Sequence, residues 1–211
     1  MTRVLLATRN AKKLIELQRI LDGALGPQRI QLVGLADVPT YQEVPETGLT
    51  FGENALLKAR EGVKWTNLPT IADDSGLAVD ALSGMPGVFS ARWSGRHGDD
   101  RANLELVLAQ IGDVPDEHRG AAFVCAAALV LPGGKEHLVD GRQTGRLLRA
   151  PRGEGGFGYD PIFLGDQQDR TNAELSPEEK DAVSHRGKAL RALAKVIAKA
   201  LPVEGGGWTG R

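Results

Sequence analysis

The sequence contains little that could cross-link the chain or give it a strong charge. Only one of its 211 residues is a cysteine, so no disulfide can form within the chain. Its 26 basic and 27 acidic residues leave a net charge of −1, so there is no strongly basic field to hold nucleic acid. The cysteine, Cys125, stands in an apolar strand-like run and is expected to be buried. An internal disulfide is therefore excluded, and we expect no nucleic-acid partner.

Long apolar runs and aromatic residues are also scarce. Aromatic residues make up 5% of the chain, and the longest apolar run, residues 121–131, is too short to span a bilayer. The first residues enter a strand pattern at once, without a signal peptide. A single cysteine is consistent with a reducing compartment. We therefore expect a cytoplasmic protein with no membrane partner.

The residues that are present follow the pattern of an α/β fold. Hydrophobic residues are 41% and charged residues 25% of the chain, as in ordinary globular proteins. The expected strands are residues 3–8, 30–33, 69–72, 77–82, 120–131, 136–148 and 163–164, and the expected helices are residues 11–25, 51–65, 100–111 and 185–201. Alternating strands and helices followed by a long hairpin indicate a mixed sheet with flanking helices. We expect one domain over residues 1–201 and a mobile tail over residues 202–211.

Three capping patterns mark expected helix starts. Thr50 is followed three residues later by Glu53, which is the reciprocal capping-box arrangement. Ser176 begins a similar pattern with proline next to it. Asp99 or Asp100 can cap the helix that ends near residue 111.

Two adjacent carboxylates, Asp73 and Asp74, follow a short apolar run and precede an expected turn at Ser75-Gly76. Like charges this close repel, so they persist where a cation neutralises them or where one is protonated. Mg²⁺ takes oxygen ligands and usually works beside substrate phosphates. The segment therefore indicates a metal site, and a solvated acidic turn at a strand end is the alternative.

Residues 8–13 join the first expected strand to the first expected helix. A helix N-terminus has unpaired N–H groups and a partial positive charge, and Lys13 adds a full charge there. The segment suits a triphosphate, although it lacks the glycines and the Lys-Ser/Thr pair of a Walker loop. An ordinary capped helix with solvent-exposed lysines is the alternative.

An aromatic ring between glycines stands late in the chain. Phe157 has glycine on both sides, so it has few local packing partners and offers a face on which a base can stack. A buried core phenylalanine is the alternative. Lys180, His185 and Arg186 flank the start of the last expected helix, where they supply hydrogen-bond donors. A solvated helix end with basic side chains is the alternative.

Taken in this order, the segments around residues 8–13, 46–55, 71–80, 155–161 and 184–187 resemble those of the inosine/xanthosine triphosphate pyrophosphatases. The resemblance extends from about Val4 to about Leu201. It implies an enzyme that uses Mg²⁺ to hydrolyse ITP, dITP and XTP to the monophosphate and pyrophosphate, and so removes them from the nucleotide pool. It also implies an elongated fold of two lobes with a central cleft, and a homodimer.

The resemblance assigns roles to individual residues. Asp74 matches the general base and a metal ligand, and Glu46 matches a second metal ligand. Glu43 is an alternative ligand, because proline stands where many relatives have the first of two glutamates. The matched substrate contacts are Thr8, Arg9, Asn10, Ala11, Lys12, Lys13, Ser75, Phe157, Gly158, Tyr159, Asp160, Lys180, His185 and Arg186.

Several points remain open at this stage. The roles of Arg9, Asp73, Lys58 and Arg92 are not assigned, and neither the preference among ITP, dITP and XTP nor the physiological metal follows from the sequence. Two other functions fit parts of the pattern. One is a phosphatase with an aspartyl nucleophile, although Ser75 stands where such enzymes need a second aspartate. The other is a module that binds nucleotides without hydrolysing them.

Overall fold

A mixed sheet of six strands forms the centre of the molecule. The computed structural model describes residues 1–9, 11–27, 29–42 and 44–201, and orders the strands β2-β1-β3-β4-β5-β6. The strands are β1 (Thr2–Leu6), β2 (Ile30–Val33), β3 (Thr70–Val79), β4 (Gly120–Val130), β5 (Glu136–Leu147) and β6 (Phe163–Gly165). β1 pairs in parallel with β2 and β3, and the other pairs are antiparallel. The predicted mixed sheet is confirmed. The predictions for Asn10, Glu43 and residues 202–211 lie outside the described residues.

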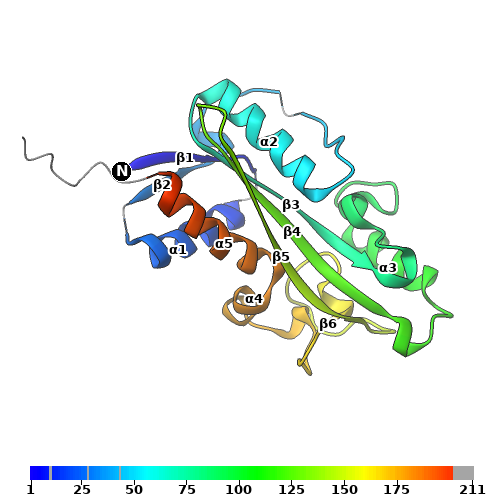
Figure 1. Cartoon of the computed structure of the whole chain (residues 1–211). Coiled ribbons are helices and arrows are strands. Elements are labelled where there is room, and N and C mark those ends of the chain that lie inside the picture. The colour runs from blue at the N-terminus through cyan, green and yellow to red at the C-terminus, as the bar shows by residue number, and fades with distance from the viewer. Residues whose placement is uncertain (10, 28, 43, 202–211) are drawn as a thin grey trace, which may run out of the picture.

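Helices flank both faces of this sheet, as predicted. They are α1 (Ala11–Leu25), α2 (Phe51–Thr66), α3 (Asp100–Gln110), α4 (Pro177–Val183) and α5 (His185–Ala200). α2 packs against β3 and β4 from one side, while α1 and α5 lie together on the other side (Figure 1). The long strands β3, β4 and β5 continue past these helices toward α3, which gives the molecule its elongated shape (Figure 1). None of the described helices is long and apolar enough to cross a membrane.

The helices begin where the sequence places their caps. The Thr50 side chain accepts from the N–H of Glu53, and the Glu53 carboxylate accepts from the N–H of Thr50. Asp99, rather than Asp100, caps α3, and Ser176 caps α4. Each such cap satisfies N–H groups that the helix cannot, for about 1 kcal/mol.

Three apolar clusters form the core. The first joins β1 and the middle of the sheet to α1 and α5, and the second lies around α3 at the far end of the long strands. The third, under α2, consists mainly of alanines, which let the helix approach the sheet closely. Cys125 is fully buried in the first cluster, as predicted. The core is thus divided between the two ends of β3, β4 and β5.

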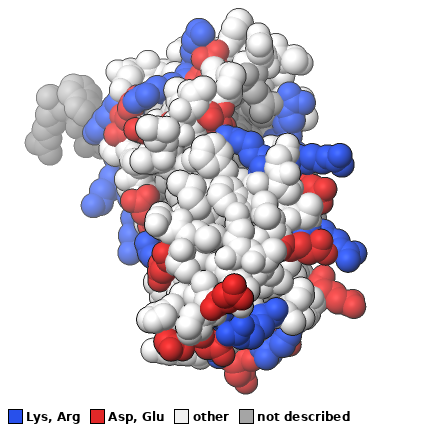
Figure 2. All heavy atoms as spheres, turned by 90° about the vertical axis from the view of Figure 1, so that its right-hand side faces the viewer, with Lys and Arg blue, Asp and Glu red and all other residues white. Residues whose placement is uncertain are grey.

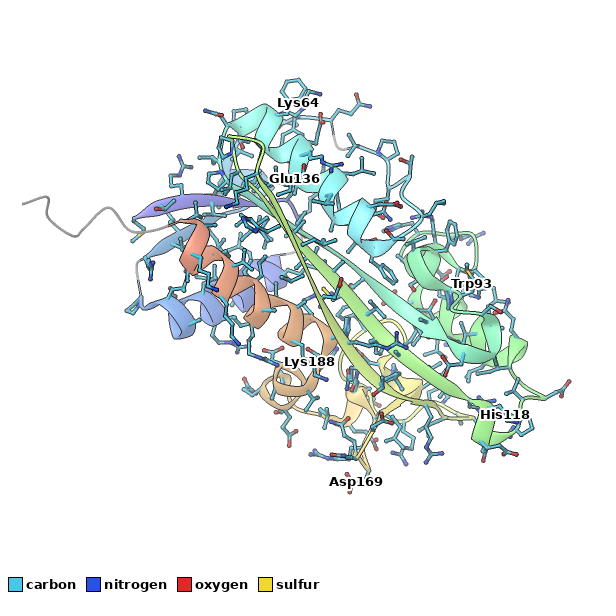
Figure 3. The ribbon with its side chains drawn as sticks, viewed as in Figure 1. Lys64, Trp93, His118, Glu136, Asp169 and Lys188 are labelled. Carbon is cyan, nitrogen blue, oxygen red and sulfur yellow. The ribbon has the colours of Figure 1, made fainter. Side chains whose placement is uncertain are left out.

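Polar contacts join the outer elements to the sheet. Arg60 of α2 forms an ion pair with Glu136 at the hairpin end, with Nε and Oε1 2.7 Å apart, and Lys188 of α5 donates to the Arg142 carbonyl at 2.9 Å (Figure 3 labels Glu136 and Lys188). On the face seen in Figure 2, basic and acidic residues are interspersed around an uncharged centre. This face therefore offers no field of one sign, in agreement with the net charge.

The prediction of two strands at residues 69–72 and 77–82, separated by a turn, is wrong. β3 is one continuous strand, and it pairs with β4 over its whole length, with Asp74 opposite Ala126 and Gly76 opposite Val124. The long ladder to β4 outweighs the local turn preference of Ser75-Gly76. Gly76 serves close packing instead, because a Cβ there would meet the Gly87 carbonyl at 2.6 Å. The acidic pair therefore lies in the middle of a strand.

The edge of β3 beside the acidic pair lies between two neighbouring segments. β1 ends at Leu6, opposite Ile71, and the N–H of Ala7 still donates to the Ile71 carbonyl at 2.8 Å. The 3₁₀ segment η3 (Gly87–Arg92) reaches the same edge further along, where Ser90 Oγ accepts from the N–H of Leu77 at 2.9 Å. Asp73 and Asp74 thus lie on the part of this edge that is between the end of β1 and η3.

Candidate active site

Asp73 and Asp74 point to opposite faces of the sheet. Successive side chains alternate along a strand, so neighbours in sequence face different layers. Asp73 meets side chains of α1 and α5, whereas Asp74 meets side chains of α2. The two aspartates therefore belong to two separate clusters of side chains, although their adjacent positions in the sequence indicated a single site.

The Asp73 cluster is a buried ion network. Lys13 Nζ donates to both carboxylate oxygens of Asp73, at 3.0 and 2.8 Å, and Arg186 Nε lies 3.5 Å from Oδ2. Arg186 also donates to Ser75 Oγ at 3.3 Å. Burial by itself disfavours the charge of Asp73, but Lys13 and Arg186 outweigh it and hold the pKa of this carboxyl well below its usual range. Asp73 is therefore ionised and fully paired.

The Asp74 cluster contains two carboxylates around one ammonium group. Lys58 Nζ lies 2.8 Å from Glu46 Oε1 and 3.3 Å from Asp74 Oδ1. Asn54 Nδ2 donates to Asp74 Oδ2 at 3.1 Å. Arg92 approaches Glu46 from η3, with Nη1 3.7 Å from Oε2. Lys58 and Asn54 are four residues apart on α2, so they face the same side of the helix.

The two carboxylates of this cluster differ in their affinity for protons. Burial raises the pKa of Asp74, Lys58 opposes this shift and the nearby charge of Glu46 adds to it. Burial also acts on Glu46, but its hydrogen bond and charge interaction with Lys58, together with Arg92, lower the pKa of that carboxyl. Desolvation likewise opposes the charge of Lys58, and Asp74 and Glu46 raise its pKa in spite of it. Asp74 is thus the carboxylate that gains most from a further cation or a proton.

Two cavities adjoin these residues. The first has a volume of about 400 Å³, and Glu46, Lys58 and Arg92 form part of its wall. The remaining lining residues are Ala7, Leu35, Tyr41, Val44, Pro45, Glu61 and His97. A second, of about 610 Å³, lies beside the start of α1 and includes Thr8 and Arg9. Ala11 and Lys12, two further predicted contacts, form the first residues of α1. The predicted phosphate segment and the acidic loop therefore border neighbouring spaces.

Phe157 is exposed and stands between two cations. Phe157 is 57% exposed, so the alternative of a buried core phenylalanine is wrong. Lys180 Nζ lies 4.9 Å and Arg186 Cζ 5.8 Å from the ring centroid, within cation–π range. Gly156 and Gly158 have φ of +73° and +59°, which glycine adopts without strain. The structure thus brings together three of the residues predicted to contact the base.

Two other predicted contacts, Tyr159 and Asp160, are buried. Asp160 is 2% exposed, forms an ion pair with Lys180 and accepts from the N–H of Phe157 at 2.9 Å. Its buried carboxylate therefore fixes the positions of the Lys180 ammonium group and the Phe157 backbone. The Tyr159 hydroxyl donates to the Ser90 carbonyl at 2.9 Å. The Gly158 N–H donates to Asp100 Oδ2 at 2.9 Å. Their contacts with substrate stay predictions.

His185 lies at the inner end of the predicted base site. It is 7% exposed, and its ring stacks on Phe123 with centroids 4.8 Å apart. Burial, with Arg186 and Lys180 nearby, keeps the pKa of His185 well below its ordinary value, so the ring is neutral. Its Nδ1 is buried and makes no hydrogen bond with any of the described residues. A neutral imidazole still carries one N–H, so it can present one donor.

Arg186 joins the parts of the site. It contacts the Phe157 ring, the Asp73 carboxylate and the Ser75 hydroxyl, and so connects the base region to β3. Three residues without an assigned role, Asn54, Lys58 and Arg92, all lie in the Asp74 cluster. The signal that identifies the first two is the spacing of four residues after a clear N-cap, which directs both toward one side of α2.

The donor set of the Asp74 cluster fits Mg²⁺ better than a metal enclosed by protein ligands. Among the described residues no three histidine, cysteine or acidic side chains gather as a metal site. Glu46 and Asp74 nevertheless face one position, since both contact Lys58 Nζ. Mg²⁺ is typically bound through one or two carboxylates, with waters and substrate phosphates completing its shell. Two carboxylates are therefore a sufficient protein contribution.

Comparisons with known proteins identify relatives of the whole chain. The dITP/XTP pyrophosphatase of Nocardia farcinica is 65% identical over 198 residues, which are 94% of this chain and 96% of that protein. The crystal structure of a nucleoside-triphosphatase / dITP/XTP pyrophosphatase from Mycobacterium abscessus is 64% identical, with a TM-score of 0.79 over 91% of this chain and 97% of the other. The HAM1 protein of Coxiella burnetii is 41% identical, with a TM-score of 0.85 over 94% of this chain and 100% of the other.

The model of the Ham1 family matches residues 4–196, nearly the whole described chain. This match confirms the resemblance that the motifs indicate, and the chain belongs to the Ham1 family.

Proposed function

We propose that this protein uses Mg²⁺ to hydrolyse ITP, dITP and XTP to nucleoside monophosphate and pyrophosphate, and so removes deaminated purines from the nucleotide pool. The observation that carries the proposal is the Asp74 cluster, where Glu46 and Asp74 share one cation. The base region of Phe157, Lys180 and Arg186 is joined to the same strand, because Arg186 contacts Asp73 and Ser75. The prediction of a nucleoside triphosphate pyrophosphohydrolase is confirmed at the level of the family, because close relatives carry the name dITP/XTP pyrophosphatase. We further propose that the enzyme acts in the cytoplasm as a homodimer.

The chemistry follows from which groups surround the phosphates. A bound Mg²⁺, held by Asp74 and Glu46, would screen the phosphate charges and polarise the bond to be broken. Asp74 orients the attacking water and takes its proton. Lys13 and the N-terminus of α1 supply positive charge as negative charge develops on the leaving pyrophosphate. Attack at the α-phosphorus is inferred from the products, monophosphate and pyrophosphate, that the family resemblance implies.

Base selection is assigned to the exposed ring and its two cations. The purine stacks on Phe157, and a donor from Arg186 or the neutral His185 meets the 6-keto oxygen of hypoxanthine or xanthine. Adenine presents an amino group at that position, so a buried donor would lose its partner at a cost of about 1–3 kcal/mol. Asp160 holds Lys180 and the Phe157 backbone in the positions that this stacking needs.

The decisive experiment is turnover of a panel of nucleoside triphosphates with Mg²⁺, with every product identified. We expect the highest kcat/KM for ITP, dITP and XTP, and equal amounts of monophosphate and pyrophosphate. Orthophosphate as the first product, or a preference for ATP, contradicts the proposal. A module that only binds nucleotides would show no turnover.

A single turnover in ¹⁸O-labelled water, together with chemical trapping, separates this mechanism from a phosphatase with an aspartyl nucleophile. Direct attack by water at the α-phosphorus places the label in the monophosphate. An aspartyl intermediate is an acyl phosphate. Water attack at its carboxyl carbon would leave the label in an enzyme carboxylate, whereas water attack at its phosphorus would place the label in the product. We therefore also expect borohydride reduction during turnover, followed by mass spectrometry of the digested protein, to trap no acyl phosphate.

A further inference from the structure

We propose that Asn54 is a positioning residue that fixes Asp74 and the Glu46 loop relative to each other. The inference rests on the proposed function, because it assigns a task to a side chain that contacts one carboxylate and the backbone beside the other. Asn54 is 0% exposed and lies in the first turns of α2, which runs along β3 (Figure 1).

Both ends of the Asn54 amide are used, each on a different segment. Its Nδ2 donates to Asp74 Oδ2 at 3.1 Å, and its Oδ1 accepts from the N–H of Gly48 at 2.8 Å. A primary amide donates through its NH₂ group and accepts through its oxygen, so it can bond two different partners at once. One buried side chain therefore connects the middle of β3 to the loop before α2.

The bond to Asp74 sets the direction of that carboxylate. Asn54 occupies Oδ2, which leaves Oδ1 toward Lys58 Nζ at 3.3 Å and hence toward the side on which Glu46 lies. Without the amide, rotation of the carboxylate would be limited only by its contact with Lys58. A carboxylate that must orient a water and bind a cation needs its free oxygen in one direction, and small displacements reduce rates strongly.

The bond to Gly48 sets the position of the acidic loop. Gly48 stands two residues after Glu46, and a Cβ there would come within 2.7 Å of Asn54 Oδ1. The glycine thus allows the loop backbone to approach the amide closely. Glu53 holds the adjoining N–H groups of Leu49 and Thr50, so the capping box fixes the helix end. Asn54 and Lys58 make the contacts of α2 with Asp74, and Asn54 is the one of the two that also holds the backbone of the loop, at Gly48.

The substitution Asn54→Asp tests this assignment, because it keeps the size and the acceptor for Gly48 but cannot donate to an ionised Asp74. The matched control is Asn103→Asp on α3. Asn103 is also buried, at 1% exposed, and its Oδ1 accepts from the N–H of Ser94 at 2.7 Å. It makes no hydrogen bond to Asp74 or Glu46, so it reports the effect of an added buried carboxylate alone.

We expect Asn54→Asp to lower kcat for ITP by about 10- to 100-fold while KM changes by less than about threefold, because the contacts around Phe157 and Lys13 are untouched. Calorimetric titration of the variant with Mg²⁺, in the presence of a non-hydrolysable ITP analogue, should show weaker or stronger metal binding by at least about fivefold, since the direction of Asp74 and the local charge both change. Asn103→Asp should leave kcat and metal binding within about threefold of the wild-type values.

A second variant, Gly48→Ala, leaves every charge in place. Its Cβ would meet Asn54 Oδ1 and Glu53 Cβ, both at 2.7 Å, so the variant displaces the loop from the amide and from the start of α2. We expect it to lower kcat by about 3- to 10-fold with little change in KM. The assignment is overturned if Asn54→Asp and Asn103→Asp reduce kcat equally, or if both Asn54→Asp and Gly48→Ala act through KM. A wild-type protein that turns over none of the three nucleotides would instead contradict the proposed function, and the Mg²⁺ titration would then decide the role of Asn54 by itself.

Discussion

Asp73 and Asp74 are neighbours in one strand, yet they have opposite electrostatic surroundings. Asp73 faces two cations, Lys13 and Arg186, and its pKa is held well below the usual range. Asp74 shares Lys58 with a second carboxylate, Glu46, and its pKa is raised, first of all by burial. The charge of Asp73 is therefore compensated by two cations of the protein itself. Asp74 and Glu46 share the ammonium group of Lys58, so Asp74 has less compensating positive charge than Asp73.

This difference assigns the two residues to different tasks. A fully paired carboxylate such as Asp73 maintains the structure around it, and in this case it holds Lys13 and Arg186 at the edge of the site. A carboxylate short of positive charge, such as Asp74, is suited to take up a proton or a metal ion. The following predictions test this division, from the largest expected effect to the smallest.

The largest effect should be a loss of stability in Asp73→Asn. Removing one partner of a buried ion pair leaves uncompensated charge, so we expect the free energy of unfolding in urea to fall by about 3–5 kcal/mol. Asp116→Asn is the control, because Asp116 pairs with Arg149 on the surface with both side chains more than half exposed. The control should lose less than about 1 kcal/mol. Equal losses in the two variants would show that Asp73 is not a structural charge.

The complementary variant, Asp74→Asn, should lose activity and retain stability. We expect kcat for ITP to fall at least ~100-fold, the usual scale for losing a general base. The free energy of unfolding without metal should change by less than about 1 kcal/mol, because burial already disfavours the charge of Asp74. Turnover within a few-fold of wild type would mean that Asp74 is not the base.

Phe157→Ala should weaken nucleotide binding by about 1–3 kcal/mol, the scale of stacking on one aromatic ring. The fold should tolerate this substitution, since the ring is largely exposed. Binding is measured by titration with a non-hydrolysable ITP analogue, and stability by thermal unfolding. A large fall in melting temperature with unchanged affinity would assign Phe157 to packing instead.

Arg186→Ala should narrow the preference for ITP over ATP, because Arg186 contacts both the Phe157 ring of the predicted base site and the Asp73 carboxylate. Losing a donor to the 6-keto oxygen removes about 1–3 kcal/mol from ITP alone. The loss of the contact with Asp73 affects both nucleotides equally, so the ratio of the two kcat/KM values isolates specificity. A parallel drop for both nucleotides would place base selection elsewhere, with His185 as the next residue to test.

The smallest effect should be a difference in pH dependence, measured without metal from about pH 7 to about pH 2, a range that extends below the unfolded pKa of aspartate of about 3.9. Asp73 has a lowered pKa, so its stabilising contribution is present above the unfolded value of about 3.9 and is lost as the pH falls. Asp74 has a raised pKa, so its contribution grows as the pH falls through that pKa and is lost as the pH rises. Stability relative to wild type should therefore change in opposite directions in Asp73→Asn and Asp74→Asn. Slopes of the same sign would contradict the assignment.

Much of the local structure was predictable because it depends on neighbouring residues. The boundaries of α1 and β2, the capping box of Thr50 and Glu53, and the long hairpin of β4 and β5 agree with the sequence patterns. Helix caps and strand alternation act within a few residues, so a single segment contains the information. The grouping of Phe157, Lys180 and Arg186 was expected only from the family resemblance.

The sequence by itself determined which residue types are available: an acidic pair, a cationic helix start, and an aromatic ring between glycines. Tertiary structure decided that β3 continues through Ser75-Gly76, because the ladder to β4 outweighs a local turn preference. It also decided which cation meets which carboxylate. Lys13 and Arg186 are 60 and 113 residues from Asp73, and Lys58 reaches Asp74 only because α2 packs on the opposite face. Such pairings depend on how layers assemble, and no local pattern encodes that.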